Sequence, residues 1–299
     1  MGKIDDELLG PMLLTAAMIL AGSTVPASKL ISSGLPPFLA TTARFGIAAP
    51  IFILVLRLRA ERIPKMPMGD WVVVLLQAGA GSVGYTVFLL FGSQHIPAAT
   101  AGIILGSLPG VMTLLAMAFL GARPSMRSLV AVSLAIAGVS VVMLENQAST
   151  TSGGTIETLI GSAALLGAVT CEAIFLLLNR KLKTTLSPLM VSSLMCVFGL
   201  GIAAVPALFE LQTVSWTDTS NLATLGIVYY ALIPTVLGFL FWYQGSARTS
   251  AFQTSVFTSV MPVSAIMLSA IILSEPITLQ QLMGITLVVS ATLIGARPS

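Results

Sequence analysis

Residues 98–120 read AATAGIILGSLPGVMTLLAMAFL, and residues 251–273 read AFQTSVFTSVMPVSAIMLSAIIL. Neither run contains a charged side chain. About 20 residues of α-helix, rising 1.5 Å per residue, cross a hydrocarbon core of roughly 30 Å. The apolar residues are continuous and do not alternate with polar ones, so each run indicates a transmembrane helix and not a strand of a membrane barrel.

The rest of the chain has the same character. Of its 299 residues, 56% are hydrophobic and only 8% are charged, whereas a soluble domain carries about 25% charged residues. So few charges do not cover a water-facing surface, and most of the surface is expected to face lipid. We predict an all-α polytopic membrane protein with ten transmembrane helices, at 11–31, 37–56, 71–92, 98–120, 125–144, 158–178, 188–208, 222–243, 251–273 and 277–296.

Charged residues alternate between successive loops. One set of loops is basic and holds Arg57, Arg59, Arg62, Lys65, Arg123, Arg127, Arg180, Lys181, Lys183, Arg248 and Arg297. The other set is acidic and holds Glu145, Glu157, Glu210, Asp218 and Glu275, with Lys29 as a basic exception. Because Lys and Arg mark the cytoplasmic side, we expect a multi-pass protein of the inner membrane with both termini in the cytoplasm.

The two halves of the chain, residues 1–148 and 149–299, resemble each other. A shift of about 150 residues brings Pro109, in the middle of one span, onto Pro262, in the middle of another. Each half holds five spans, an odd number, so the second half enters the membrane in the opposite direction. The sequence therefore predicts two inverted five-helix repeats, a design of secondary transporters whose substrate site lies near the midplane between the repeats.

These features resemble the EamA-type drug/metabolite transporter superfamily. The resemblance rests on the five-plus-five pattern, on the related stretches 98–109 and 251–262, and on residues 273–284, LSEPITLQQLMG, a Glu-Pro pair followed by an apolar span with an early Gly. It covers essentially the whole chain, although Arg123 stands where the first repeat of the family often has Glu. In overall character the chain is most similar to YddG-type aromatic amino-acid exporters, which implies the export of small metabolites.

Aromatic and hydroxyl side chains within the spans are candidates for substrate binding. Tyr85, Tyr229 and Tyr230 lie too deep for interfacial anchors, and such rings can stack on a ligand and offer a hydroxyl. Further hydrogen bonds could come from Ser23, Thr24, Thr254, Thr258 and Ser259. The alternative for these Ser and Thr residues is hydrogen bonding between helices. Trp242 and Tyr243, near the end of a span, are expected to anchor the protein at the membrane interface.

Two charged residues and two prolines also fall within spans. Glu172 is an ionisable group at a costly depth, and it is a candidate for coupling transport to protons, with a structural hydrogen bond as the alternative. Arg44 is expected to extend its long side chain toward the headgroups in preference to binding a substrate carboxylate. Pro109 and Pro262 each remove a backbone hydrogen bond, so they are expected to bend their helices and to shape or gate a central cavity.

Three classes of function compete. A secondary transporter agrees with the inverted repeat. A channel would need a polar stripe or a ring of charges along one path. No motif brings together the carboxylates, histidines or nucleophiles of an enzyme active site. Cys171 and Cys196 lie in apolar spans and form no metal-binding pattern, so no metal, cofactor or nucleic-acid partner is expected. We predict a transporter in the lipid bilayer that exports small neutral or zwitterionic metabolites, chiefly amino acids with aromatic or other apolar side chains. A multidrug or nucleobase exporter of the same superfamily is the alternative.

Overall fold

A computed structural model of the chain describes residues 2–120, 125–148, 154–179, 181–212, 214, 220–249, 254 and 256–296. Within these residues all regular elements are helices. Four charged positions that entered the predicted loop pattern, Arg123, Arg180, Asp218 and Arg297, lie outside the described residues.

The described helices follow the predicted order. The first half contains α1 (Gly2–Ser32), α2 (Pro37–Leu58), a third helix made of α3 (Met68–Gln77), the π-helical segment η1 (Ala78–Gly84) and α4 (Tyr85–His95), a fourth made of α5 (Ala98–Leu105) and α6 (Leu108–Leu120), and α7 (Met126–Ala148). The second half contains α8 (Gly154–Asn179), α9 (Pro188–Glu210), a third helix made of α10 (Asn221–Tyr230), the π-helical segment η2 (Ala231–Leu237) and α11 (Gly238–Ser246), then α13 (Val260–Leu273) and α14 (Leu279–Ala296).

Seven helices of the described chain are long and apolar enough to cross a membrane, at 8–32, 37–58, 68–95, 98–119, 156–179, 188–210 and 221–246. Three shorter apolar helices, Leu129–Val142, Val260–Leu273 and Leu279–Ile294, fall within the remaining predicted spans. Large apolar side chains such as Leu54 and Ile271 are exposed on the outside, where lipid tails would contact them. The structure confirms a polytopic helical membrane protein.

The second helices of the two halves, α2 and α9, pack antiparallel. At the start of α2, the backbone N–H of Leu39 donates to Oε2 of Glu210, the last residue of α9, at 2.7 Å. At the start of α9, the Ser187 hydroxyl donates to the carboxylate of Glu61, which follows the end of α2. Equivalent helices therefore run in opposite directions, as inverted repeats require.

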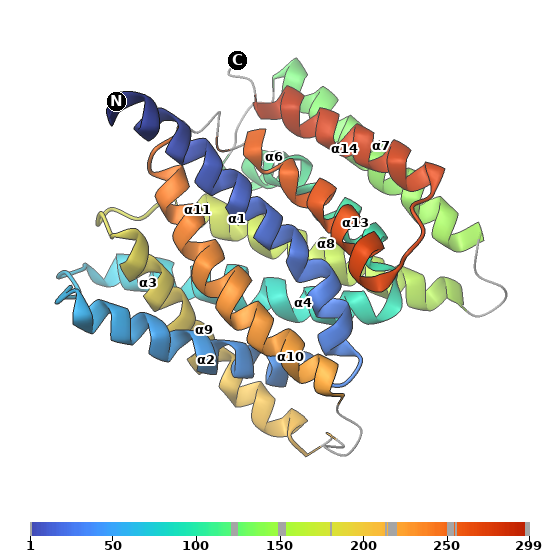
Figure 1. Cartoon of the computed structure of the whole chain (residues 1–299). Coiled ribbons are helices and arrows are strands. Elements are labelled where there is room, and N and C mark those ends of the chain that lie inside the picture. The colour runs from blue at the N-terminus through green and yellow to red at the C-terminus, as the bar shows by residue number, and fades with distance from the viewer. Residues whose placement is uncertain are drawn as a thin grey trace.

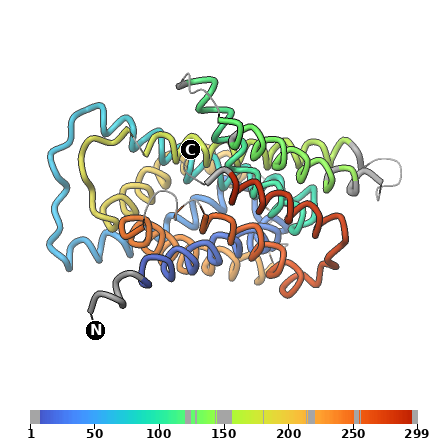
Figure 2. The backbone as a smooth tube through the Cα atoms, turned by 90° about the horizontal axis from the view of Figure 1, so that it is seen from above, coloured from blue at the N-terminus to red at the C-terminus, as the bar shows by residue number. Residues whose placement is uncertain are grey.

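The last helices of the two halves, α7 and α14, form a second antiparallel pair. Gly284 contacts Gly138 and Val142, and Gly138 also contacts Val288, so the order of contacts along one helix is reversed along the other. Figure 1 shows this pair at one edge of the bundle and α2 with α9 at the opposite edge. Figure 2, turned by 90°, also shows the red α14 beside the green α7.

The third helix of each half contains a π-helical segment at a matching place. In η1, small residues allow a close approach, since a Cβ on Gly81 would lie only 2.5 Å from the Phe175 side chain of α8. In η2, Pro234 has no N–H to donate, and the Thr235 hydroxyl donates to the Tyr230 carbonyl at 2.9 Å. Such segments are frequent at functional sites, and both contribute residues to the cavity described below.

The fourth helices are interrupted at related positions. A turn at residues 106–107 separates α5 from α6, and a turn at residues 258–259 precedes α13. Pro109 and Pro262 lie in the first turn of the helix that follows, where a missing N–H is tolerated. A Cβ on Gly106 would lie 3.0 Å from the Cβ of Pro262, so the two interruptions are in contact near the centre of the bundle.

Candidate functional site

A cavity of about 150 Å³ lies between the two halves of the bundle. Its wall is built from α1, α2, α4, α8, α10, α11, α13 and α14, from both π-helical segments, and from both sides of the interruption between α5 and α6. Most of these contributions come from the middle of a predicted span. The cavity therefore occupies the midplane position between repeats that secondary transporters use for their substrate.

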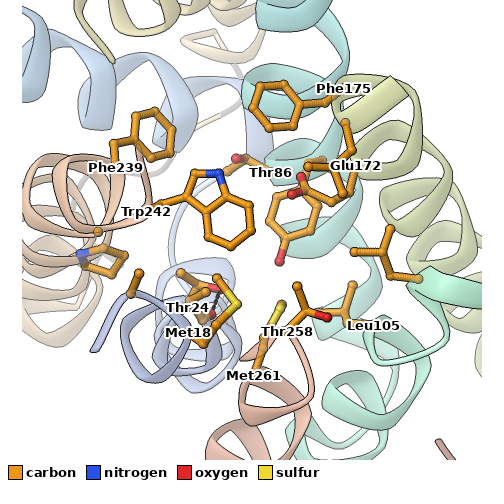
Figure 3. A pocket seen from close by; sticks show the side chains of 18 of the residues that line it. Met18, Thr24, Thr86, Leu105, Glu172, Phe175, Phe239, Trp242, Thr258 and Met261 are labelled. Carbon is orange, nitrogen blue, oxygen red and sulfur yellow. Dashed lines mark hydrogen bonds between the residues drawn. The ribbon is translucent and has the colours of Figure 1, made fainter. Parts of the chain in front are cut away.

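Aromatic side chains form much of the wall. Figure 3 shows Trp242 and Phe239 of α11 on one side of the cavity and Phe175 of α8 on the other. Tyr243 also lines the cavity. The expectation that Trp242 and Tyr243 are interfacial anchors is wrong, because both side chains line the cavity. The sequence carried no signal for this orientation, since Trp and Tyr near a span end occur in both settings.

Several predicted site residues are brought together in the wall. These are Tyr85, Tyr230, Thr24, Thr258, Glu172, Pro109 and Pro262. They add hydroxyls and a carboxyl group to a surface that is otherwise mainly apolar. Their part in substrate binding or gating stays a prediction.

The other predicted site residues are not part of the wall. The Tyr229 side chain is 38% exposed on the outside of the bundle, and its hydroxyl donates to Oγ of Ser23 at 2.7 Å. The Ser259 hydroxyl donates to a backbone carbonyl of its own turn, and the Thr254 hydroxyl lies 2.9 Å from that of Thr249. The Tyr229–Ser23 contact matches the alternative interpretation, hydrogen bonding between helices, whereas the contacts of Ser259 and Thr254 are local in the chain.

Arg44 of α2 lies inside the bundle and lines the cavity. Its side chain is 5% exposed, so the expectation that it extends to the headgroups is wrong. One terminal nitrogen donates to the carbonyl of Ser82 in η1 at 3.3 Å. The guanidinium carbon lies 4.1 Å from the ring centre of Phe45 and 4.6 Å from that of Tyr230. The available signal was the presence of an Arg within a span, which by default indicates function.

Glu172 of α8 also lines the cavity, one helical turn before Phe175 (Figure 3). Within the described part of the chain, no hydrogen bond or ion pair reaches its carboxyl group. The structural hydrogen bond that was the alternative for Glu172 is therefore not seen. The carboxyl group is free to meet a ligand or a proton that enters the cavity.

A carboxylate holds the two repeats together at one end of the bundle. Both oxygens of Glu275, in the connection from α13 to α14, accept backbone hydrogen bonds at the start of α5, from Ala98 and Ala99 at 2.9 Å each. Beside them, Nζ of Lys29 donates to the carbonyl of Ile96 at 2.9 Å. A carboxylate is favoured there because the first N–H groups of a helix lack partners and carry partial positive charge. We call this arrangement the Glu275 cap, and this end of the bundle the Glu275 face.

Closely packed apolar residues separate the cavity from the Glu275 face. Val25, Leu89, Ala101 and Leu165 belong to one cluster and are fully buried. A Cβ on Gly102 would lie 2.7 Å from that of Ala265, so α5 and α13 are in direct contact here. The cavity is therefore closed toward the Glu275 face.

The cavity wall extends toward the other end of the bundle. Its lining includes Leu176 and Trp242, near the ends of α8 and α11 that point away from the Glu275 face. We call this end the Asp70 face, because Asp70 accepts hydrogen bonds there from the backbone N–H and the hydroxyl of Thr184, at 2.9 and 2.6 Å. The structure thus holds the cavity in a conformation that is closed at one face and extends toward the other.

Inverted five-helix repeats around a midplane cavity define a membrane protein of the secondary-transporter class. The model of the EamA-like transporter family matches residues 8–144 and 159–295, so both repeats are covered. The chain belongs to this family.

Individual similarities agree with the family assignment. An uncharacterized transporter of Bacillus subtilis, YetK, is 32% identical over 281 residues, which cover 94% of this chain and 84% of YetK. A probable terminal-alkyne amino-acid exporter of Streptantibioticus cattleyicolor is 25% identical over 195 residues, covering 65% of this chain and 61% of that protein. One solved crystal structure, 20% identical, aligns over 95% of both chains with a TM-score of 0.64, which shows a shared fold.

Proposed function

We propose that this transporter exports small neutral or zwitterionic metabolites, chiefly amino acids with aromatic or other apolar side chains, by alternating access. The observation that carries the proposal is the aromatic-lined midplane cavity, closed at the Glu275 face. Its size supports the substrate class. A cavity of about 150 Å³ lined by apolar side chains takes up benzene in another protein, so this cavity has room for a small apolar or aromatic solute.

The direction of transport is part of the proposal. Described basic residues near the Asp70 face include Arg57, Arg59, Lys183 and Arg248, and this face is proposed to be cytoplasmic, with both termini on the same side of the inner membrane. The cavity then extends toward the cytoplasm, where an exporter collects its substrate. The similarity to a relative named as a probable amino-acid exporter supports this direction and this substrate class.

Alternating access is proposed to use the two repeats, residues 1–148 and 149–299, as the moving parts. The helix interruptions beside Pro109 and Pro262 touch at the centre, so a change of angle at one would displace the other. Two such related hinges would allow the repeats to exchange conformations, which opens each face in turn.

The test is saturable uptake of a labelled panel by purified protein in liposomes: phenylalanine, tryptophan, methionine, leucine, threonine, a nucleobase, a dicarboxylate and a cationic drug. Saturable transport of the apolar amino acids without the dicarboxylate is the expected result. Transport of the nucleobase or the drug alone would replace this proposal by the second candidate, a multidrug or nucleobase exporter. Flux of all solutes without saturation would indicate a passive channel instead.

A further inference from the structure

Arg44 is a buried cation without a carboxylate partner among the described residues. Its side chain is 95% removed from solvent exposure, and its Nε has no hydrogen-bond partner. Its partners include the carbonyl of Ser82 and the rings of Phe45 and Tyr230. A charge inside a membrane protein is costly, and such residues are typically paired or functional. Here the protein leaves the charge to be neutralised by something else.

The surroundings of Arg44 fix its guanidinium without using up its donors. Aromatic faces attract the cation and hold its plane, and the Ser82 carbonyl accepts from one terminal nitrogen. A guanidinium has five N–H donors arranged to bind a carboxylate by two parallel hydrogen bonds. Because Arg44 lines the cavity, the carboxylate of a ligand bound there could accept hydrogen bonds from its guanidinium.

Glu172 provides a carboxyl group from another helix. It lines the same cavity from α8, while Arg44 enters from α2. No hydrogen bond or ion pair joins these two described side chains. The rings of Phe175, Phe239 and Trp242 line the same cavity (Figure 3). The cavity thus offers a guanidinium, a carboxyl group and an apolar surface.

We infer that this cavity recognises the α-amino-acid group itself, with Arg44 binding the carboxylate, Glu172 binding the ammonium group, and the aromatic wall holding the side chain. The inference rests on the proposed function and narrows it to zwitterionic α-amino acids. A zwitterion offers a carboxylate to Arg44 and an ammonium group to Glu172, and it adds no net charge to the bundle. An amine without a carboxylate leaves Arg44 unpaired, and an acid without an amine leaves Glu172 unpaired. Both kinds of ligand are therefore expected to bind more weakly than an amino acid.

The first experiment needs no variant. Wild-type protein in liposomes takes up labelled L-phenylalanine in competition with unlabelled L-phenylalanine, phenethylamine, which lacks the carboxylate, and 3-phenylpropionate, which lacks the amine. Each analogue is expected to compete about 10-fold to 100-fold more weakly than L-phenylalanine, the factor that one charged hydrogen-bonded contact provides. Competition by either analogue as strong as that of L-phenylalanine would overturn the inference.

Crossed substitutions then assign the two charges. Arg44→Gln is expected to weaken L-phenylalanine binding and to remove the discrimination against phenethylamine, while keeping that against 3-phenylpropionate. Glu172→Gln is expected to weaken L-phenylalanine binding too, but to remove the discrimination against 3-phenylpropionate and keep that against phenethylamine. A residue that only supports folding would lower transport of every ligand equally, so equal losses in both variants would refute the assignment. If wild-type protein transports none of the amino acids, the proposed function fails; if it transports them and ignores the charges, only the present inference fails.

Discussion

The Glu275 cap gives the most specific prediction about conformational change. The substitution Glu275→Gln keeps one carbonyl oxygen but replaces the other oxygen by an NH₂ group, which faces a backbone N–H of Ala98 or Ala99. The variant therefore loses one of two hydrogen bonds and the charge that strengthens both. The cap lies at the closed end of the cavity, so its loss is expected to favour opening of the Glu275 face.

The size of the effect follows from the geometry. A hydrogen bond to a charged group contributes about 1.5–3 kcal/mol, and a carboxylate at a helix N-terminus adds about 0.3–1 kcal/mol. The lost stabilisation of the closed face is on the order of 2–3 kcal/mol, which corresponds to a roughly 30- to 150-fold rise in the ratio of open to closed molecules.

A buried thiol reports the opening. Ser28 of α1 is fully buried, one turn beyond the cavity residue Thr24 toward the Glu275 face. Ser28→Cys, in a background with Cys171→Ala and Cys196→Ala, would react with a polar methanethiosulfonate reagent only when this face opens. The reaction rate is expected to rise with Glu275→Gln by about the factor given above.

The matched control is Glu210→Gln on the same face. Glu210 also binds the start of a helix, at Leu39, but α2 and α9 are held at both ends, because Glu61 binds Ser187 at the other face. This control is expected to change the labelling rate several-fold less. An unchanged rate in Glu275→Gln, or an equal rise in both variants, would refute the role of the Glu275 cap.

Further substitutions test the cavity and the packing around it. Trp242→Ala is expected to weaken competition by L-phenylalanine in liposome uptake about 10-fold or more, because burial of a large apolar group contributes about 1.5–3 kcal/mol; no change would place the substrate elsewhere. Tyr230→Leu is expected to weaken the same competition, whereas Tyr229→Leu, outside the cavity, leaves it nearly unchanged, and the reverse order would contradict the assignment of the wall. Gly102→Ala places a Cβ 2.7 Å from a side chain of α13 and is expected to lower the thermal unfolding midpoint in detergent, since overpacking costs about 1–3 kcal/mol. Gly46→Ala, where a Cβ meets nothing within 4 Å, is its control and is expected to raise the midpoint slightly; equal midpoints would refute the packing argument.

Much of the architecture could be predicted from the sequence because membrane spans follow from local composition. The charge-free runs 98–120 and 251–273 indicated helices, and the shared proline near the middle of each indicated the repeat. Those prolines also lie beside the interruptions of the fourth helices. The π-helical segments were not predicted, because a change of hydrogen-bond register leaves no periodic signal in the sequence.

The cavity wall was only partly predictable, because depth along a helix is local information and rotation about its axis is not. Tyr229 and Tyr230 illustrate this: both lie at the same depth, but one side chain faces outward and the other lines the cavity. Trp242 and Arg44 were assigned to the interface by the usual preferences of their residue types. Tertiary packing of α11 and α2 instead places both side chains in the cavity wall.

Counterflow tests the central claim most directly. Liposomes that contain the protein are loaded with unlabelled L-phenylalanine and then diluted into labelled L-phenylalanine. A cavity that opens to one face at a time predicts a transient, saturable accumulation of label above the equilibrium level, abolished when the lumen holds no substrate. Accumulation that never exceeds equilibrium and rises linearly with concentration would contradict alternating access through this cavity.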